Sequence, residues 1–145
     1  MIRRLLIAAA LCAGVTNVLA DNDPIVERQQ LMKSLSEASK APGAMMKGET
    51  PFDLGKVQAS LKTFADVGKK APGLFPETSK TGHDTAALPK VWSDKADFNG
   101  KWEKFEKEAV AAQASITDEA SFKANFPAIG KNCGSCHEGY RAKKS

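Results

Sequence analysis

Two cysteines and a histidine near the end of the chain have the residue types and the spacing that hold a haem covalently. Cys133, Cys136 and His137 form a C-x-x-C-H motif, which is the attachment signature of c-type haem. The two thiols can add to the haem vinyl groups as thioethers, and the histidine can bind the iron as its proximal ligand. The chain has no second cysteine pair for a zinc site and no βαβ pattern around the motif for a redox dithiol. The motif therefore predicts one covalently attached haem c, with its iron, per chain.

If the iron has a second protein ligand, that ligand must lie upstream of the motif, because only residues 138–145 follow His137. Apart from Met1, the candidates are three methionines and one histidine: Met32, Met45, Met46 and His83. Which of them can reach the haem depends on the elements that carry them.

Four amphipathic helices account for most of the chain after residue 20. We expect the first helix after the cap Asp23, the second from Thr50-Pro51 or Asp53 until Ala71-Pro72-Gly73, the third after the cap Ser93, and the fourth from Thr117-Asp118. Apolar residues recur at steps of three and four in the last three helices, at Leu54, Val57, Leu61, Phe64 and Gly68, at Phe98, Trp102, Phe105, Ala109, Ala112 and Ile116, and at Phe122, Phe126, Ile129, Cys133, Cys136 and Tyr140. Short connections favour antiparallel neighbours, so the predicted fold is all-α, an antiparallel up-down-up-down four-helix bundle with one covalent haem c.

Helix geometry separates the candidate ligands. In such a bundle the first and fourth helices run antiparallel, so the end of the fourth lies beside the start of the first. At about 1.5 Å per residue, Met32 lies roughly 12 Å from the helix start, and His137 lies roughly 9 Å from a helix end near Lys143. Met45 and Met46 would lie roughly 32 Å along, towards the other end. A helix methionine usually fills core space, but the matching heights favour Met32 as the distal iron ligand.

The first 20 residues have the features of a secretory signal peptide. Arg3 and Arg4 form a basic start, residues 5–15 are apolar but too short to span a bilayer, and Val18 and Ala20 are small residues before a cleavage site. We therefore expect a signal peptide over residues 1–20, cleaved after Ala20. An exported haem c protein of a bacterium is expected in the periplasm.

The remaining residues, 21–145, have the length of one domain, which we expect to be the haem domain. The formal charge of the whole chain is +4, and removal of Arg3 and Arg4 leaves a small positive balance that two haem propionates would nearly cancel. This balance gives little support to nucleic-acid binding, which normally needs a basic patch or stripe. We expect no transmembrane segment in the mature protein.

The chain resembles the class II cytochromes c, the cytochrome c-prime family, over the whole mature sequence. The resemblance lies in Cys133-Gly134-Ser135-Cys136-His137 with Tyr140-Arg141, in Lys47-Gly48-Glu49-Thr50-Pro51-Phe52-Asp53, and in Trp92-Ser93. Gln30-Leu31-Met32-Lys33 is similar to the low-spin cytochrome c-556 branch, in which a first-helix methionine binds the iron opposite the histidine. High-spin members usually have an apolar residue there and bind nitric oxide or carbon monoxide.

The resemblance also implies roles for two arginines. The family arginine that matches Arg28 lies near a haem propionate, and the one that matches Arg141 lies near the proximal histidine; the alternative is that both are solvated. Basic residues around the motif, namely Lys131, Arg141, Lys143 and Lys144, could steer an acidic redox partner. We expect an electron carrier and not an enzyme, with redox proteins as partners and either a monomeric or a homodimeric state. The alternative function is gas binding by five-coordinate haem.

Overall fold

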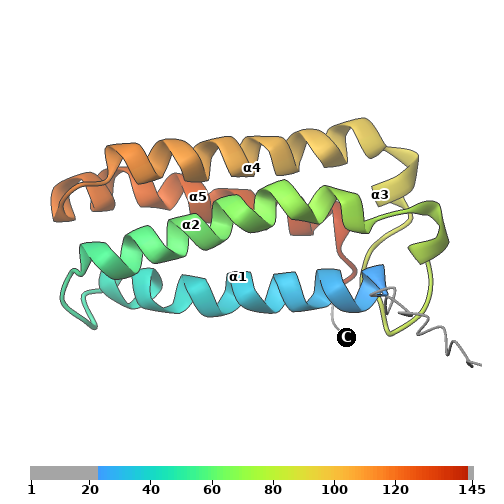
Figure 1. The fold of residues 1–145 in the computed structure, drawn as a ribbon, viewed down its shortest axis with the longest axis horizontal. Helices are drawn as coiled ribbons and strands as arrows, with labels where there is room; N and C mark the ends of the chain where they lie inside the picture. The colour runs from blue at the N-terminus through green and yellow to red at the C-terminus, as the bar shows by residue number, and fades with distance from the viewer. Residues whose placement is uncertain (1–22, 144–145) are drawn as a thin grey trace, which may run out of the picture.

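The fold is an antiparallel four-helix bundle. The structure is a computed structural model that describes residues 23–143, so the expected signal peptide and Lys144 lie outside the described residues. The long helices are α1 (Pro24–Met46), α2 (Leu54–Lys70), α4 (Lys95–Ser115) and α5 (Glu119–Tyr140). Each runs opposite to the one before it (Figure 1). The predicted all-α, up-down-up-down architecture is confirmed.

Aspartate side chains cap three of the four long helices. The Asp23 carboxylate accepts hydrogen bonds from the backbone N–H groups of Ile25 and Val26, and Asp53 caps α2. Asp118 and Ser121 form a reciprocal capping box at the start of α5. The bond from the Ser121 N–H, followed by that from its hydroxyl, lowers the pKa of Asp118. These starts agree with the predicted positions.

The connection between α2 and α4 has more structure than predicted. It contains the 3₁₀ turns η1 (Ala71–Leu74) and η2 (Glu77–Ser79) and the short helix α3 (Lys90–Ser93). The prediction that Ser93 caps the third long helix is wrong, because Ser93 ends α3 and Asp94 occupies the cap position of α4. The extra helical turn packs against α4 and α5 and buries Val91.

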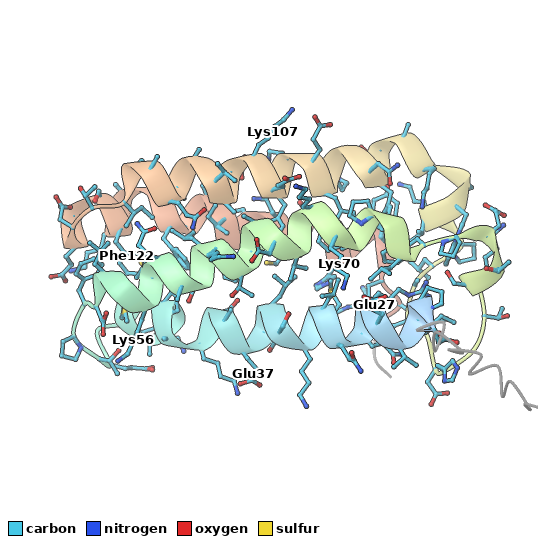
Figure 2. The ribbon with its side chains drawn as sticks, viewed as in Figure 1. Glu27, Glu37, Lys56, Lys70, Lys107 and Phe122 are labelled. Carbon is cyan, nitrogen blue, oxygen red and sulfur yellow. The ribbon has the colours of Figure 1, made fainter. Side chains whose placement is uncertain are left out.

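The core follows the predicted stripes with two exceptions. All six apolar positions predicted for the third long helix are buried, from Phe98 to Ile116. Leu54 was predicted to face the core but is 36% exposed, because it lies in the first turn of α2 at the end of the bundle. Cys133 was also placed in a core stripe but is exposed. In Figure 2, Phe122 lies inside the bundle, whereas Glu37 and Lys107 point away from it.

The helices do not pack equally closely around the bundle. α1 packs on α2, α2 packs closely on α4, and α4 packs on α5, while α1 and α5 meet only loosely. Gly68 permits the close approach of α2 and α4, since a Cβ there would lie 3.0 Å from the Cβ of Glu106. The loose side of the bundle therefore lies between α1 and α5, and Cys133 is exposed there. No helix within residues 23–143 is long and apolar enough to cross a membrane.

Candidate haem site

Two adjoining cavities lie between the start of α1 and the end of α5. Their volumes are about 130 Å³ and about 370 Å³. Five residues line both cavities: Met32, Trp102, Cys136, His137 and Arg141. The two cavities are therefore parts of one binding region.

The C-x-x-C-H motif lies on the α5 wall of this region. Cys133 lines the larger cavity, while Cys136 and His137 line both and are half-buried. Burial raises the pKa of the Cys136 thiol, so the thiol of the unreacted chain is protonated at neutral pH. Burial, followed by the charge of Arg141, lowers the pKa of His137 and favours the neutral imidazole that binds metals.

Met32 lies on the opposite wall, on α1. Its side chain is half-buried and lines both cavities with His137, as the matching helix heights predicted. Met45 is buried and Met46 half-buried at the far end of the bundle, beside the residues that connect α1 and α2. His83 is exposed and pairs with Asp23. Of the predicted candidates, Met32 alone shares a cavity with His137; its bond to iron stays a prediction.

The remaining walls fit a large aromatic cofactor. Phe75, Val91, Phe98 and Tyr140 line the smaller cavity, so most of its surface is apolar. The Trp102 indole nitrogen is buried and has no hydrogen-bond partner among the described residues. Buried polar atoms are normally satisfied, so this nitrogen is suited to a polar group of a bound molecule. Two thiols, an imidazole and a thioether around an apolar space are the donor set of haem c.

Arg28 lies on the wall of the smaller cavity and is only 4% exposed. Its two terminal nitrogens donate to Leu74 O (3.1 Å), Ser79 Oγ (2.8 Å), Ser79 O (2.9 Å) and Thr85 Oγ1 (2.7 Å). Burial lowers its pKa, and no carboxylate lies within ion-pair distance among the described residues. Arg28 is thus not a solvated arginine. Four of its N–H groups hold the α2–α4 connection, and its contact with haem stays a prediction.

Arg141 and Tyr140 continue the α5 wall. Arg141 is exposed, lines both cavities, and donates its backbone N–H to His137 O at 3.2 Å. The Tyr140 hydroxyl donates to Asp97 Oδ2 at 2.5 Å, and this hydrogen bond lowers the pKa of the Asp97 carboxyl. The same bond connects α5 to α4 beside the motif. The family resemblance placed Arg141 near His137, and Arg141 lines both cavities with His137.

Several wall residues were not predicted. Phe75, Thr85, Ala86 and Ala87 come from the α2–α4 connection and line the smaller cavity. No periodic pattern marks such residues, because their positions depend on contacts with α1 and α5. Trp102 was predicted as core, and its position on both cavity walls was missed; a polar indole on a core stripe was the available signal.

A four-helix bundle with this motif beside an apolar cavity defines a c-type cytochrome. A family model described as Cytochrome C' matches residues 23–141. Cytochrome c' of Rhodopseudomonas palustris is 50% identical over 139 residues, which cover 96% of this chain and 95% of the relative. Cytochrome c-556 of the same organism is 35% identical over 148 residues, with 99% of each chain covered. The solved structure of cytochrome c' from Rhodopseudomonas palustris matches with a TM-score of 0.83 and 53% identity, covering 85% of this chain and 98% of the other.

The chain therefore belongs to the cytochrome c' family, as its sequence motifs predicted. It is a monohaem cytochrome that binds haem c covalently, and the predicted cofactor is confirmed. Relatives named cytochrome c' and cytochrome c-556 both match over nearly the whole chain. Assignment to one branch depends on the residue that faces the iron, which is Met32 in the prediction.

Proposed function

We propose that this protein is a periplasmic electron carrier, with haem held by Cys133 and Cys136 and the iron bound by His137 and Met32. The observation that carries the proposal is that Met32 and His137 project from two different helices into the same pair of cavities. We also propose that residues 1–20 are the signal peptide and that residues 21–145 form the mature haem domain.

The protein's part in this chemistry is to hold its ligands still. When bound, haem c supplies a one-electron couple between ferric and ferrous iron. α1 and α5 are long helices that hold the Met32 thioether and the His137 imidazole in fixed positions, so both ligands can stay in place during transfer. The apolar walls exclude water, and the soft thioether favours a higher reduction potential than a second nitrogen ligand.

The described walls of this site hold few groups that could act as acids or bases. Within the described residues, neither cavity is lined by a carboxylate, and His137 is the sole histidine on either wall. Lys101 and Tyr140 also line the cavities, but Lys101 pairs with Asp97 at 3.8 Å and the Tyr140 hydroxyl donates to the same carboxylate, so neither is placed as a free proton donor or acceptor. We infer that the protein is a carrier and not an enzyme.

The exposed side of the motif suits an acidic redox protein. Cys133 is exposed, and Lys131, Arg141 and Lys143 have no carboxylate within ion-pair distance among the described residues. Glu138 is the one acidic residue within residues 131–143, so the net charge of this segment is positive. Such a surface would speed encounter with an acidic partner, and the effect would weaken with salt.

Spectra of the purified protein in both redox states test the ligand set. The wild type should be six-coordinate and low-spin and should bind carbon monoxide slowly or weakly. Met32→Ala should move the iron towards high spin and speed carbon monoxide binding, while the matched control Met45→Ala should leave the spectrum unchanged. A high-spin wild type, or an unchanged spectrum in Met32→Ala, would contradict the assignment.

Gas binding is the second candidate. It is favoured by the higher identity to a relative named cytochrome c' than to one named cytochrome c-556. In the high-spin members that the sequence resembles, the sixth position is open. The same spectra decide between the two functions, because gas binding requires Met32 to leave that position free.

A further inference from the structure

A segment of the α2–α4 connection joins the two helices that carry the proposed iron ligands. Residues 79–88, which we name the strap, run across the haem end of the bundle between α1 and α5. Its residues Thr85, Ala86 and Ala87 line the smaller cavity together with Met32 and His137. Since α1 and α5 pack only loosely on each other, the strap is a direct connection between their ends.

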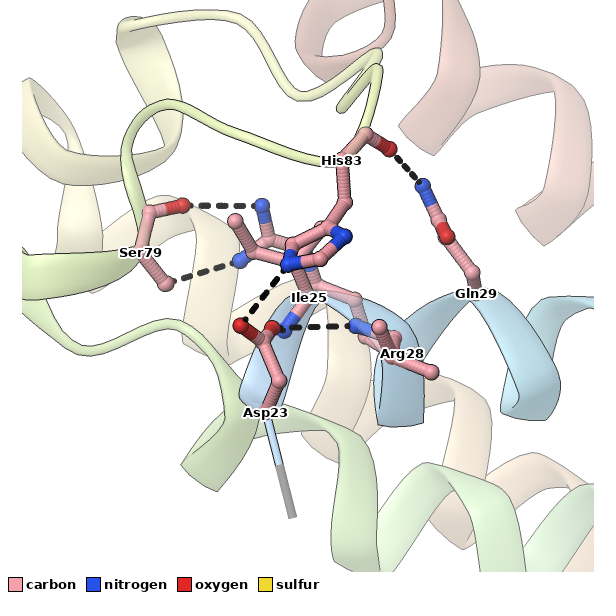
Figure 3. Close-up of polar contacts among 7 residues, drawn as sticks. Asp23, Ile25, Arg28, Gln29, Ser79 and His83 are labelled. Atoms are coloured by element: carbon pink, nitrogen blue, oxygen red, sulfur yellow. Dashed lines mark hydrogen bonds and ion pairs between the residues drawn. The ribbon is translucent and has the colours of Figure 1, made fainter. Parts of the chain in front are cut away.

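The first turns of α1 hold one side of the strap (Figure 3). Arg28 donates to both oxygens of Ser79 and to Thr85 Oγ1, and Gln29 Nε2 donates to His83 O at 2.7 Å. His83 Nε2 lies 3.1 Å from Asp23 Oδ2. Arg28 and Gln29 precede Met32 by four and three residues, so these contacts fix the helical turn that carries Met32.

The end of α5 holds the other side. Leu88 N donates to Tyr140 O at 3.0 Å, and Ala142 N donates to Ala86 O at 2.8 Å, which forms a short antiparallel pairing around Arg141. Tyr140 follows His137 by three residues, so this attachment lies one helical turn from the proximal ligand. Each side of the strap is therefore anchored one turn away from a proposed iron ligand.

We propose that the strap is a positioning element that sets the separation of Met32 and His137 and so keeps the Met32 thioether on the iron. The inference rests on the proposed ligand set. Thr85 and Gln29 act through Met32 and do not bind the iron themselves. Loosening the strap lets the start of α1 move away from α5, which raises the fraction of protein whose sixth iron position is open to a gas.

The test uses the holoprotein with two strap changes, Thr85→Val and Gln29→Ala, alone and together. Thr85→Val removes the acceptor for Arg28 at similar size, and Gln29→Ala removes the donor to the His83 carbonyl. The readouts are the carbon monoxide association rate, the high-spin fraction and the reduction potential. The association rate is the most sensitive, because it scales with the open fraction even when that fraction is small.

We expect each change to raise the carbon monoxide association rate about fivefold, the factor that corresponds to about 1 kcal/mol for one hydrogen bond. The reduction potential should fall, since the thioether is bound for less of the time. Thr85→Ser keeps the acceptor oxygen and should behave as the wild type.

Gln58→Ala is the matched control at the far end of the bundle. Gln58 Nε2 donates to Gln113 O (3.0 Å) and Ile116 O (2.8 Å), so its loss removes bonds of the same kind between other segments. It should lower the melting temperature and leave the three haem readouts unchanged. Strap variants that melt lower without a faster carbon monoxide reaction would overturn the proposal, as would an equal effect of Gln58→Ala. A high-spin wild type would instead refute the proposed function, and the positioning role with it.

Discussion

Replacing Arg28 by methionine should destabilise the protein strongly, although methionine retains the apolar stem. The change removes four hydrogen bonds from a charged donor to Leu74, Ser79 and Thr85. It also removes the stacking of the guanidinium on Phe75, whose ring centre lies 4.7 Å away. A hydrogen bond to a charged group contributes about 1.5–3 kcal/mol, and Arg28 makes four of them. Much of that is offset because the buried guanidinium carries a desolvation cost that methionine does not, so we expect a loss of about 3 kcal/mol.

Thermal unfolding of the holoprotein, followed by far-ultraviolet circular dichroism, measures this loss. For a domain of this size, 1 kcal/mol corresponds to about 4 °C, so the melting temperature should fall by about 12 °C. Arg28→Lys should lose most of the same stability, because a lysine keeps the charge but not the planar fork of donors. A fall of less than about 4 °C in Arg28→Met would refute the view that this side chain holds the connection.

Lys95→Met is the matched control for Arg28. Lys95 also lies over Phe75, with its nitrogen 5.7 Å from the ring centre, but it makes a single hydrogen bond, to Phe75 O at 3.0 Å. Its replacement should cost about 1 kcal/mol, the value of one hydrogen bond. Equal effects of the two changes would mean that loss of a cation near Phe75, and not loss of the hydrogen-bond network, determines the stability.

Attachment and capping give two more measurable outcomes. Haem should stay with the polypeptide through denaturation and acid–organic extraction, and replacing both Cys133 and Cys136 by alanine should abolish this; unextractable haem in the double variant would show that other groups hold it. Because the pKa of Asp118 is lowered by its Ser121 hydrogen bonds, its contribution to stability is present above about pH 4 and is lost as the pH falls through the folded-state pKa. Between about pH 5 and pH 3 the melting temperature of Asp118→Asn should therefore fall less than that of the wild type, because asparagine keeps an acceptor but cannot titrate. Melting temperatures that fall in parallel would show that other carboxylates determine the loss of stability in acid.

Regular helix geometry explains why much of the site was predictable. A fixed rise per residue places Met32 and His137 at similar heights once the helices are antiparallel, and the structure places both in the same cavities. Aspartate caps and apolar spacing likewise gave the starts of α1 and α5 and the buried stripe of α4. These features depend on local rules that act within a few residues along the chain.

The strap and the role of Arg28 could not be predicted in the same way. The strap contains His83 and Asp84 with φ of 45° and 49°, a left-handed conformation that residues with a side chain seldom adopt. Tertiary contacts with α1 and α5 select this conformation, and no local pattern encodes them. Arg28 shows the same limit, because its partners lie about 50 residues further along the chain and only the fold brings them together.

Membership of the cytochrome c' family fixes the bundle and the cofactor, but it does not fix the function. Relatives named cytochrome c' and cytochrome c-556 align with nearly the whole chain, so one scaffold serves both. Function then depends on the few groups that face the iron, and the groups we propose for that role are His137 on α5 and Met32 on α1, which line the same cavities. A thioether on α1 can bind iron only if α1 stays close to α5, and these helices hardly touch. In the proposed positioning role, the contacts of Arg28 and Gln29 with the strap keep α1 close enough to α5 for the Met32 thioether to reach the iron.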